Sequence, residues 1–360
     1  MKKITSTSVL VLSLLLIMGQ GCFSFGPSDG STETSGPAGV FVSIDKGEEW
    51  KQISLLPKAD GVKNLSEVSV YRIEEDPMDP KAMYWASREN GLFFSYDDGK
   101  TWQQASAPLN AGFIYSSAVH PTNKCIIFAT DGAKVYKSID CSRSWKEVHR
   151  EDRQNAKLSD IEINQFNYKI YISKLNGDLL VSTDLGETWT ILNRFEGEAQ
   201  YINGDATKAD TLYVATKEDG LFRSDDAGKT WVSLKKVISE YPKALKLRRF
   251  YVHPTKTGVL YWVSTYGILK TTDGGDTWEP MNLFTSPGSV DIYGFAVNPQ
   301  NDKEIYYTTT EKGRSTLYRT DDGGVTWSTK RLPTGQVPTA IRVHPEHGDY
   351  VYVGFTIPPK

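Results

Sequence analysis

From about residue 40 onward, short runs of hydrophobic, β-branched and aromatic residues alternate with clusters of Gly, Pro, Asn and Asp. Residues 249–253 and 259–264 are two such runs, separated by a turn signal at 254–258. The runs at 91–94 and 316–319 are of the same kind. Short apolar runs bounded by turn residues predict β-strands. Because about four runs fit into each recurring unit, the pattern predicts the four-stranded blades of a propeller.

One octapeptide, Ser/Thr-x-Asp-x-Gly-x-Thr-Trp, recurs along the chain and marks this unit. Five copies are clear, and two are degenerate: 43–50 has Glu49 in place of Thr, and 138–145 has Ser142 and Ser144 in place of Gly and Thr. The spacing of 42 to 52 residues between copies is typical of propellers or solenoids. The seven central aspartates, predicted to be structural, are Asp45, Asp97, Asp140, Asp184, Asp226, Asp273 and Asp322.

The residues of the octapeptide suit a tight hairpin turn. An Asp side chain accepts hydrogen bonds from backbone N–H groups just ahead of it, and Gly supplies the positive φ that such a turn requires. The Thr-Trp pair then begins the next strand, and Trp brings a large apolar body to bury.

The two ends of the chain each supply half a blade. The N-terminal part has only two strand-like runs, 40–42 and 50–55, and the C-terminal part has only 340–343 and 350–355. We therefore predict an all-β fold, a seven-bladed β-propeller of four-stranded antiparallel blades over 40–360. Terminal strands that share one blade close the ring without exposing an edge strand.

These repeats resemble the Asp-box (BNR) repeats of a propeller superfamily that includes sialidases, sortilin-type receptors, xyloglucanases and photosystem II assembly factors. The resemblance covers nearly all of residues 40–360. It implies that the boxes are structural turns lying away from the ligand face. It is specific for the fold, and a fold does not determine a function.

The N-terminus has the layout of an export signal. Residues 1–21 combine a positive start with an apolar run at 9–18 that is too short to span a bilayer stably. The run ends just before Cys22, as in a bacterial lipobox, although Gly19 stands where Leu is usual. We expect acylation of Cys22, with an ordinary secretory signal as the alternative. Residues 22–39, rich in Ser, Gly, Pro and Thr, are expected to be a flexible tether. The predicted product is an exported, membrane-anchored lipoprotein facing the periplasm or the cell exterior.

The composition of the chain limits the classes of partner that it can bind. The 41 basic and 44 acidic side chains nearly balance, so no nucleic acid is expected, because its binding needs a dense basic face. A mean hydropathy of −0.41 excludes a polytopic membrane protein. We expect a monomer without cofactors, whose partners are an unknown protein or glycan and the membrane reached through the lipid anchor.

Cys125 and Cys141 are the two cysteines of the predicted propeller. Folding the hairpin about residues 131–132 places them side by side, so we predict a disulfide in an oxidising compartment. Free buried thiols are the alternative.

Neither metal ligands nor a catalytic set is predicted. His120, His253 and His344 each precede Pro at one repeat position, which indicates a strand-end turn element. Calcium needs about six to eight oxygens at one point, whereas each box offers one carboxylate committed to its own turn. Asp160 and Asp291 both begin first strands, where they can reach the ligand face, but no motif pairs them.

The resemblance adds two arguments against an enzyme. Sialidases carry an Arg-Ile-Pro segment ahead of the first box and have six blades, and this chain has no such segment. Xyloglucanases place their cleft between two propellers, and we count one here. A glycosidase also needs two facing carboxylates. An enzyme should therefore show carboxylates converging in a cleft with shifted pKa values.

The longest inter-blade connection, 235–250, is strongly basic and suggests a binding face. Its candidate residues are Lys235, Lys236, Lys243, Lys246, Arg248 and Arg249. The function predicted from the sequence is a membrane-tethered, non-catalytic binding or assembly scaffold. The alternatives are a glycoside hydrolase of the sialidase-like superfamily and a sortilin-like peptide receptor.

Overall fold

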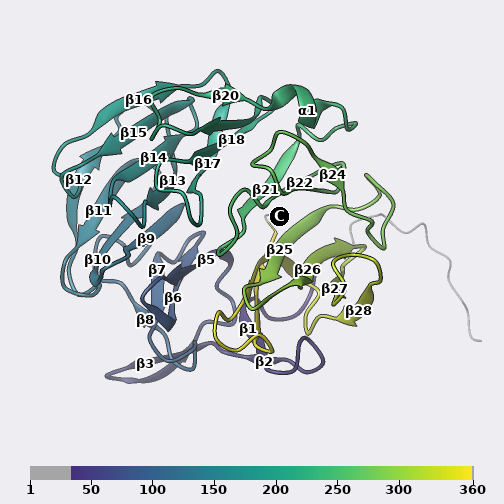
Figure 1. Cartoon of the computed structure of the whole chain (residues 1–360). Coiled ribbons are helices and arrows are strands. Elements are labelled where there is room, and N and C mark those ends of the chain that lie inside the picture. The colour runs from purple at the N-terminus through teal and green to yellow at the C-terminus, as the bar shows by residue number, and fades with distance from the viewer. Residues whose placement is uncertain (1–33, 359–360) are drawn as a thin grey trace, which may run out of the picture. The chain divides into compact units, whose positions relative to one another are not determined.

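A computed structural model describes residues 34–358, which form a ring of seven four-stranded antiparallel blades (Figure 1). One blade joins the two ends of the described chain, in the order β2 (Lys51–Gln52), β1 (Gly39–Ser43), β30 (Val351–Thr356) and β29 (Val337–Val343). The next blade consists of β5 (Val70–Asp76), β6 (Asp79–Ser87), β7 (Leu92–Ser95) and β8 (Gln103–Gln104). It is followed by the blade of β9 (Ser116–His120), β10 (Asn123–Thr130), β11 (Lys134–Ser138) and β12 (Lys146–Arg150). The blade after that consists of β13 (Leu158–Ile163), β14 (Ile170–Lys174), β15 (Asp178–Ser182) and β16 (Thr190–Arg194).

The remaining three blades continue the same order. The first of them consists of β17 (Glu198–Gly204), β18 (Leu212–Lys217), β19 (Gly220–Ser224) and β20 (Val232–Ser233). The second consists of β21 (Leu247–Val252), β22 (Leu260–Ser264), β23 (Ile268–Thr271) and β24 (Glu279–Pro280). The third consists of β25 (Ile292–Asn298), β26 (Asn301–Glu311), β27 (Arg314–Thr320) and β28 (Ser328–Arg331). The first strands β5, β9, β13, β17, β21, β25 and β29 contact one another in turn around the centre.

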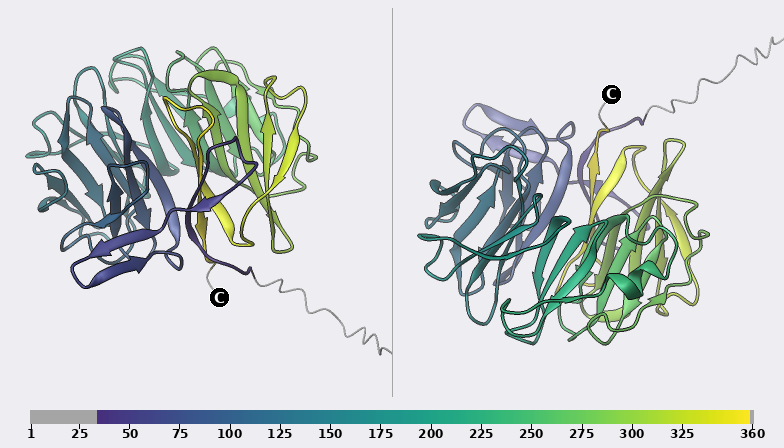
Figure 2. Two further views of the ribbon diagram at one scale, coloured as in Figure 1. Left: turned by 90° about the horizontal axis from the view of Figure 1, so that it is seen from below. Right: turned by 90° about the horizontal axis from the view of Figure 1, so that it is seen from above.

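The predicted closure of the ring is confirmed. Strand β1 pairs antiparallel with β30, from Gly39 opposite Phe355 to Ser43 opposite Val351. Figure 2 shows the yellow C-terminal strand beside the purple N-terminal one. The ammonium group of Lys46 also reaches the buried carboxylate of Glu304 in the preceding blade, with an Nζ–Oε2 distance of 2.9 Å. The terminal blade is therefore fastened both within its sheet and to its neighbour.

The octapeptides form the expected turns between the third and fourth strands. In the copy at 182–189, Asp184 Oδ1 accepts hydrogen bonds from Ser182 Oγ at 2.8 Å and from the Thr188 N–H at 2.9 Å. The Thr188 hydroxyl and N–H hold the pKa of Asp184 at about 2. The Gly186 N–H donates to Ser182 Oγ at 2.8 Å. Each aspartate is thus committed to its own turn, as the residue pattern requires.

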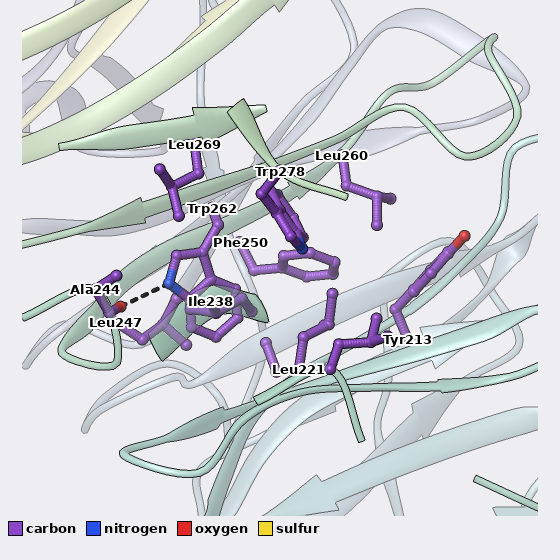
Figure 3. Close-up of a cluster of buried hydrophobic side chains, with 12 residues drawn as sticks. Tyr213, Leu221, Ile238, Ala244, Leu247, Phe250, Leu260, Trp262, Leu269 and Trp278 are labelled. Atoms are coloured by element: carbon purple, nitrogen blue, oxygen red, sulfur yellow. Dashed lines mark hydrogen bonds between the residues drawn. The ribbon is translucent and has the colours of Figure 1, made fainter. Parts of the chain in front are cut away.

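Apolar clusters lie between successive blades and hold them together. In the cluster of Figure 3, Tyr213 and Leu221 of one blade pack with Phe250 and Trp278 of the next. The buried indole of Trp262 donates to the carbonyl oxygen of Ala244 at 2.7 Å, so burying this ring leaves no orphaned donor. Ala244 belongs to the 235–250 connection, which is thereby tied to the core.

Three details differ from the predicted elements. The predicted strand 50–55 is only β2, after which the chain forms a separate hairpin, β3 (Leu55–Lys58) with β4 (Gly61–Asn64). The reason is Trp102 of the next blade, whose indole donates to Ile53 O and whose backbone N–H donates to Leu55 O. The basic connection contains a short helix, α1 (Lys235–Ser239).

The third difference concerns the predicted tether. The described part of the segment predicted as tether, 34–39, is bound to the propeller: β1 already begins at Gly39, and residues 34–36 are hydrogen bonded to the connection that precedes β29. Gln336 Nε2 donates to Gly36 O at 3.0 Å, and the Gly335 N–H donates to Ser35 O at 2.9 Å. The rest of the tether and the signal segment, Cys22 included, lie outside the described residues. Among the residues described, no helix is long and apolar enough to cross a membrane.

The degenerate box gives a stability prediction. Ser142 occupies the usual glycine position with φ +67°, a conformation that costs a non-glycine residue about 1 kcal/mol. We expect Ser142→Gly to raise the free energy of unfolding by about that amount, measured by urea denaturation of the oxidised protein. Gly186→Ala is the opposite control, because its new Cβ lies 2.8 Å from the Phe128 ring at φ +84°. An unchanged or lower midpoint for Ser142→Gly contradicts this account.

Candidate functional site

The first strands surround a central channel that contains two cavities. The upper cavity, of about 140 Å³, lies near the starts of β5, β21 and β29, and Tyr71, Arg72 and Glu74 are among its lining residues. The lower cavity, of about 370 Å³, lies near the ends of β9, β13 and β17, and Glu162 is among its lining residues. The upper cavity is on the side of the inter-blade connections, where we expected ligands to bind.

A guanidinium group crosses the channel between blades. Arg72 of β5 donates to the carboxylate of Asp160 on β13, and its Nη1 also lies 3.7 Å from Glu74 Oε1. The guanidinium carbon lies 4.9 Å from the ring centroid of Tyr201 on β17. Asp160 Oδ2 accepts a further hydrogen bond from the Ile202 N–H at 3.2 Å. Two carboxyl groups from different blades therefore converge on one nitrogen of Arg72.

A second arginine extends this network to two more blades. Arg249 of β21 donates to Tyr201 Oη at 3.3 Å and to the carbonyl oxygen of Thr339 on β29 at 2.9 Å. Arg72 and Arg249 thus both contact Tyr201, from opposite sides of the ring of blades. The side chains of this network are held by partners on five blades, so they need little reorganisation to bind a ligand.

Two channel carboxyl groups have pKa values near neutrality. Burial raises the pKa of Glu74 to about 7, with a further rise from the charge of Asp160 and an opposing effect of Arg72. Burial likewise raises the pKa of Glu162 to about 8, against a hydrogen bond from the Gly204 N–H at 3.1 Å. At neutral pH both groups hold a proton in a large fraction of molecules. A carboxyl group with such a pKa is suited to general acid catalysis.

The structure separates the two aspartates that the sequence analysis named together. Asp160 is buried in the channel beside Arg72. Asp291 lies outside it and pairs with Arg248 at 2.6 Å, with both side chains nearly half exposed. Sequence reasoning missed Arg72, Glu74 and Glu162. The available signal was the alternation of charged residues along two first strands, Arg72 with Glu74 on β5 and Asp160 with Glu162 on β13.

The basic patch proves to be divided among different environments. Lys235 pairs with Asp219 at 2.7 Å, and Arg248 is taken by Asp291. Arg249 points into the channel network. Lys236, Lys243 and Lys246 are exposed and form no ion pair with residues 34–358. The six residues do not form one uncommitted cationic surface.

Other predicted residues are placed as follows. Cys125 and Cys141 form a disulfide. The buried ring of His253 accepts a hydrogen bond from the Thr255 N–H at its Nδ1, and His120 and His344 make the same turn contact two residues ahead. Among residues 34–358, no group of three or more His, Cys, Asp or Glu side chains is arranged to hold a metal ion.

A family model described as "Sortilin, neurotensin receptor 3" matches residues 38–174 and 177–282, more than half of the chain. The chain belongs to the Sortilin-Vps10 family. It is also 23% identical over 300 residues to the xyloglucanase Xgh74A of Acetivibrio thermocellus, a match that covers 73% of this chain and 33% of that protein. This Sortilin-Vps10 chain thus spans about a third of the length of that relative.

Two solved structures show the same fold at low identity. The GH74 xyloglucanase of Xanthomonas campestris has a TM-score of 0.64 at 17% identity, covering 80% of this chain and 51% of its own. YCF48 bound to D1 peptide has a TM-score of 0.60 at 13% identity, covering 80% of this chain and 94% of its own. Together with the family match, they place the chain in the BNR and sortilin-like propeller superfamily.

The prediction of a non-catalytic scaffold was wrong. The curated relatives and several structural neighbours are xyloglucanases or GH74 enzymes, so the glycoside hydrolase alternative fits better. The preference against an enzyme rested on absent sialidase motifs and on a single propeller. The channel adds a physical reason for the correction: Glu74 and Asp160 converge on Arg72, Arg72 and Glu74 line a cavity, and burial raises the pKa of Glu74.

Burial of Glu162 predicts a pH-dependent stability. Between pH 4.5, the ordinary pKa of a glutamate, and about pH 8, the pKa of Glu162 in the folded chain, the folded chain keeps the Glu162 proton while the unfolded chain releases it. Stability therefore falls as pH rises through this window. We expect Glu162→Gln to melt like the wild type near pH 4.5 and at least about 3 °C higher at pH 8.5. The exposed Glu89→Gln is the control, and equal melting temperatures at pH 8.5 would refute the assignment.

Proposed function

We propose that this chain is a glycoside hydrolase whose substrate binds at the upper cavity. The observation that carries this proposal is the convergence of Glu74 and Asp160 on Arg72 Nη1, with the Glu74 pKa at about 7. Glycosidases use two carboxyl groups flanking the scissile bond, one as the acid and one as an anion. The relatives support this reaction class, since they are named xyloglucanases. A xyloglucan-type polysaccharide is the substrate we propose.

The environments of the two groups assign their roles. Glu74 is the more exposed of the two, at 28% of its side chain, and acts as the acid that protonates the leaving glycosidic oxygen. Asp160 accepts hydrogen bonds from Arg72 and from the Ile202 N–H, so we assign it the role of the anion. Its negative charge stabilises the positive charge that develops at the anomeric carbon, and Asp160 takes the proton that water loses as it adds there. After the products leave, the proton returns to Glu74 through solvent. Arg72 is a positioning residue that holds Asp160 in place.

The proposed site predicts how activity depends on Glu74. Glu74→Gln should lower kcat on xyloglucan at least about 100-fold, because Gln cannot give up a proton. In the wild type, kcat should fall as pH rises through about 7, where Glu74 loses its proton. Reducing-sugar release across pH 5 to 9 measures both effects.

Asp291→Asn is the matched control, because it removes a carboxylate from the same face but outside the channel. It should leave kcat and the pH profile unchanged. Circular dichroism of each variant checks that the fold is retained. An active Glu74→Gln enzyme, or an unchanged fall in rate near pH 7, would exclude Glu74 as the acid.

The disulfide is consistent with export into an oxidising compartment. We further propose that Cys22 carries the lipid anchor predicted from the sequence. Labelling cells with an alkyne fatty acid should tag the full chain, and Cys22→Ser should abolish the label and release the protein from the membrane fraction. Labelling that survives Cys22→Ser would contradict this assignment.

A further inference from the structure

A cluster of three aromatic rings lies beside the upper cavity. Tyr71, which lines that cavity, meets Phe113 edge-on with ring centroids 4.7 Å apart. Phe113 lies 4.4 Å from Tyr115, and Tyr71 lies 6.2 Å from Tyr115. All three rings are partly exposed. We call these three residues the aromatic cluster.

The chain that presents Phe113 is rigidly held. The Gly112 N–H donates to Glu89 O at 2.8 Å, and Gly112 O accepts from the Gly91 N–H at 2.9 Å. The Ile114 N–H donates to Ser87 O at 3.0 Å. Backbone bonds thus fix the residues on both sides of Phe113 to the turn between β6 and β7. A ligand that stacks on this ring meets a preformed surface and loses little binding energy to ordering it.

Two cations flank the cluster. The guanidinium carbon of Arg88 lies 5.7 Å from the Tyr71 centroid and 5.9 Å from that of Phe113. Lys157 Nζ lies 5.8 Å from the Tyr115 centroid and donates to its hydroxyl at 3.2 Å. Over residues 34–358, neither cation has a carboxylate oxygen within 4 Å, and Arg88 Nε is buried without a hydrogen-bond partner. Arg72 and Arg248, by contrast, are paired with carboxylates.

We propose that the aromatic cluster and its two cations bind a carboxylate-bearing sugar unit, such as a uronate, of the polysaccharide substrate. This inference rests on the proposed function and refines its substrate class. The rings offer apolar surface to the C–H face of a pyranose. The guanidinium group of Arg88 offers the paired donors that recognise a carboxylate. Because Tyr71 belongs to both sites, a chain bound at the cluster continues toward Glu74.

The test is binding of two matched ligands to the full chain carrying Glu74→Gln, which prevents turnover. One ligand is cellohexaose, and the other is the same β-1,4 chain oxidised at C6 to glucuronate. Calorimetry at low salt should show the oxidised chain binding at least about tenfold more tightly. Arg88→Gln should remove that preference, and Lys157→Gln should reduce it. Raising the salt concentration should narrow it as well.

Control variants distinguish binding at a defined site from nonspecific attraction of an anionic ligand to positive charges on the protein. Arg143→Gln removes one positive charge from an exposed box turn and should preserve the preference. Equal binding of the two hexasaccharides, or equal losses for Arg88→Gln and Arg143→Gln, would overturn the inference. So would a hexaglutamate peptide that binds as tightly as the oxidised sugar.

Failure of this inference is distinguishable from failure of the proposed function. Wild-type hydrolysis with no preference for the acidic ligand would overturn the uronate site alone. Selective binding that depends on Arg88, without any hydrolysis by the wild-type protein, would overturn the catalytic proposal while supporting the site.

Discussion

The pairing of β1 with β30 is the interaction on which the rest of this structure depends. An open row of blades would leave two sheet edges unpaired and ready to join other chains. Closing the row brings the first strands of all blades around one axis, so residues distant in sequence face one channel. Arg72 and Asp160, 88 positions apart, contact each other only because the ring is closed. The Lys46–Glu304 ion pair reinforces the same closure between neighbouring blades.

The fold was predictable from the sequence because its determinants are local. A box such as 182–189 contains the acceptor, the donors and the glycine of its own turn, so residue types alone reveal it. The half-blades at the two ends likewise revealed the closure. The hairpin β3–β4 was not predictable in this way, because what diverts the chain is Trp102 in a different blade.

The candidate site was only partly predictable, for the opposite reason. Asp160 was named from its place at the start of a strand, but its partner Arg72 and the proton-holding Glu74 come from another blade. Charge density along the chain was misleading as well. Six basic residues in one connection suggested a shared surface, yet Arg249 points into the channel and Arg248 is neutralised by Asp291. Side-chain direction, which decides these outcomes, is set by packing between blades.

The channel network is also unlike what stability alone would favour. Moving charged groups out of water costs several kcal/mol per ion, and apolar residues of similar volume often replace a buried ion pair without loss. The clusters between the blades already bury large apolar side chains, so the ring does not need Arg72 and Asp160 to cohere. Two further carboxyl groups, Glu74 and Glu162, lie in the same channel with their pKa values raised by burial. Costly charges gathered at one point beside a cavity are characteristic of functional sites. These charges favour the channel, rather than the outer box turns, as the place of the proposed catalytic site.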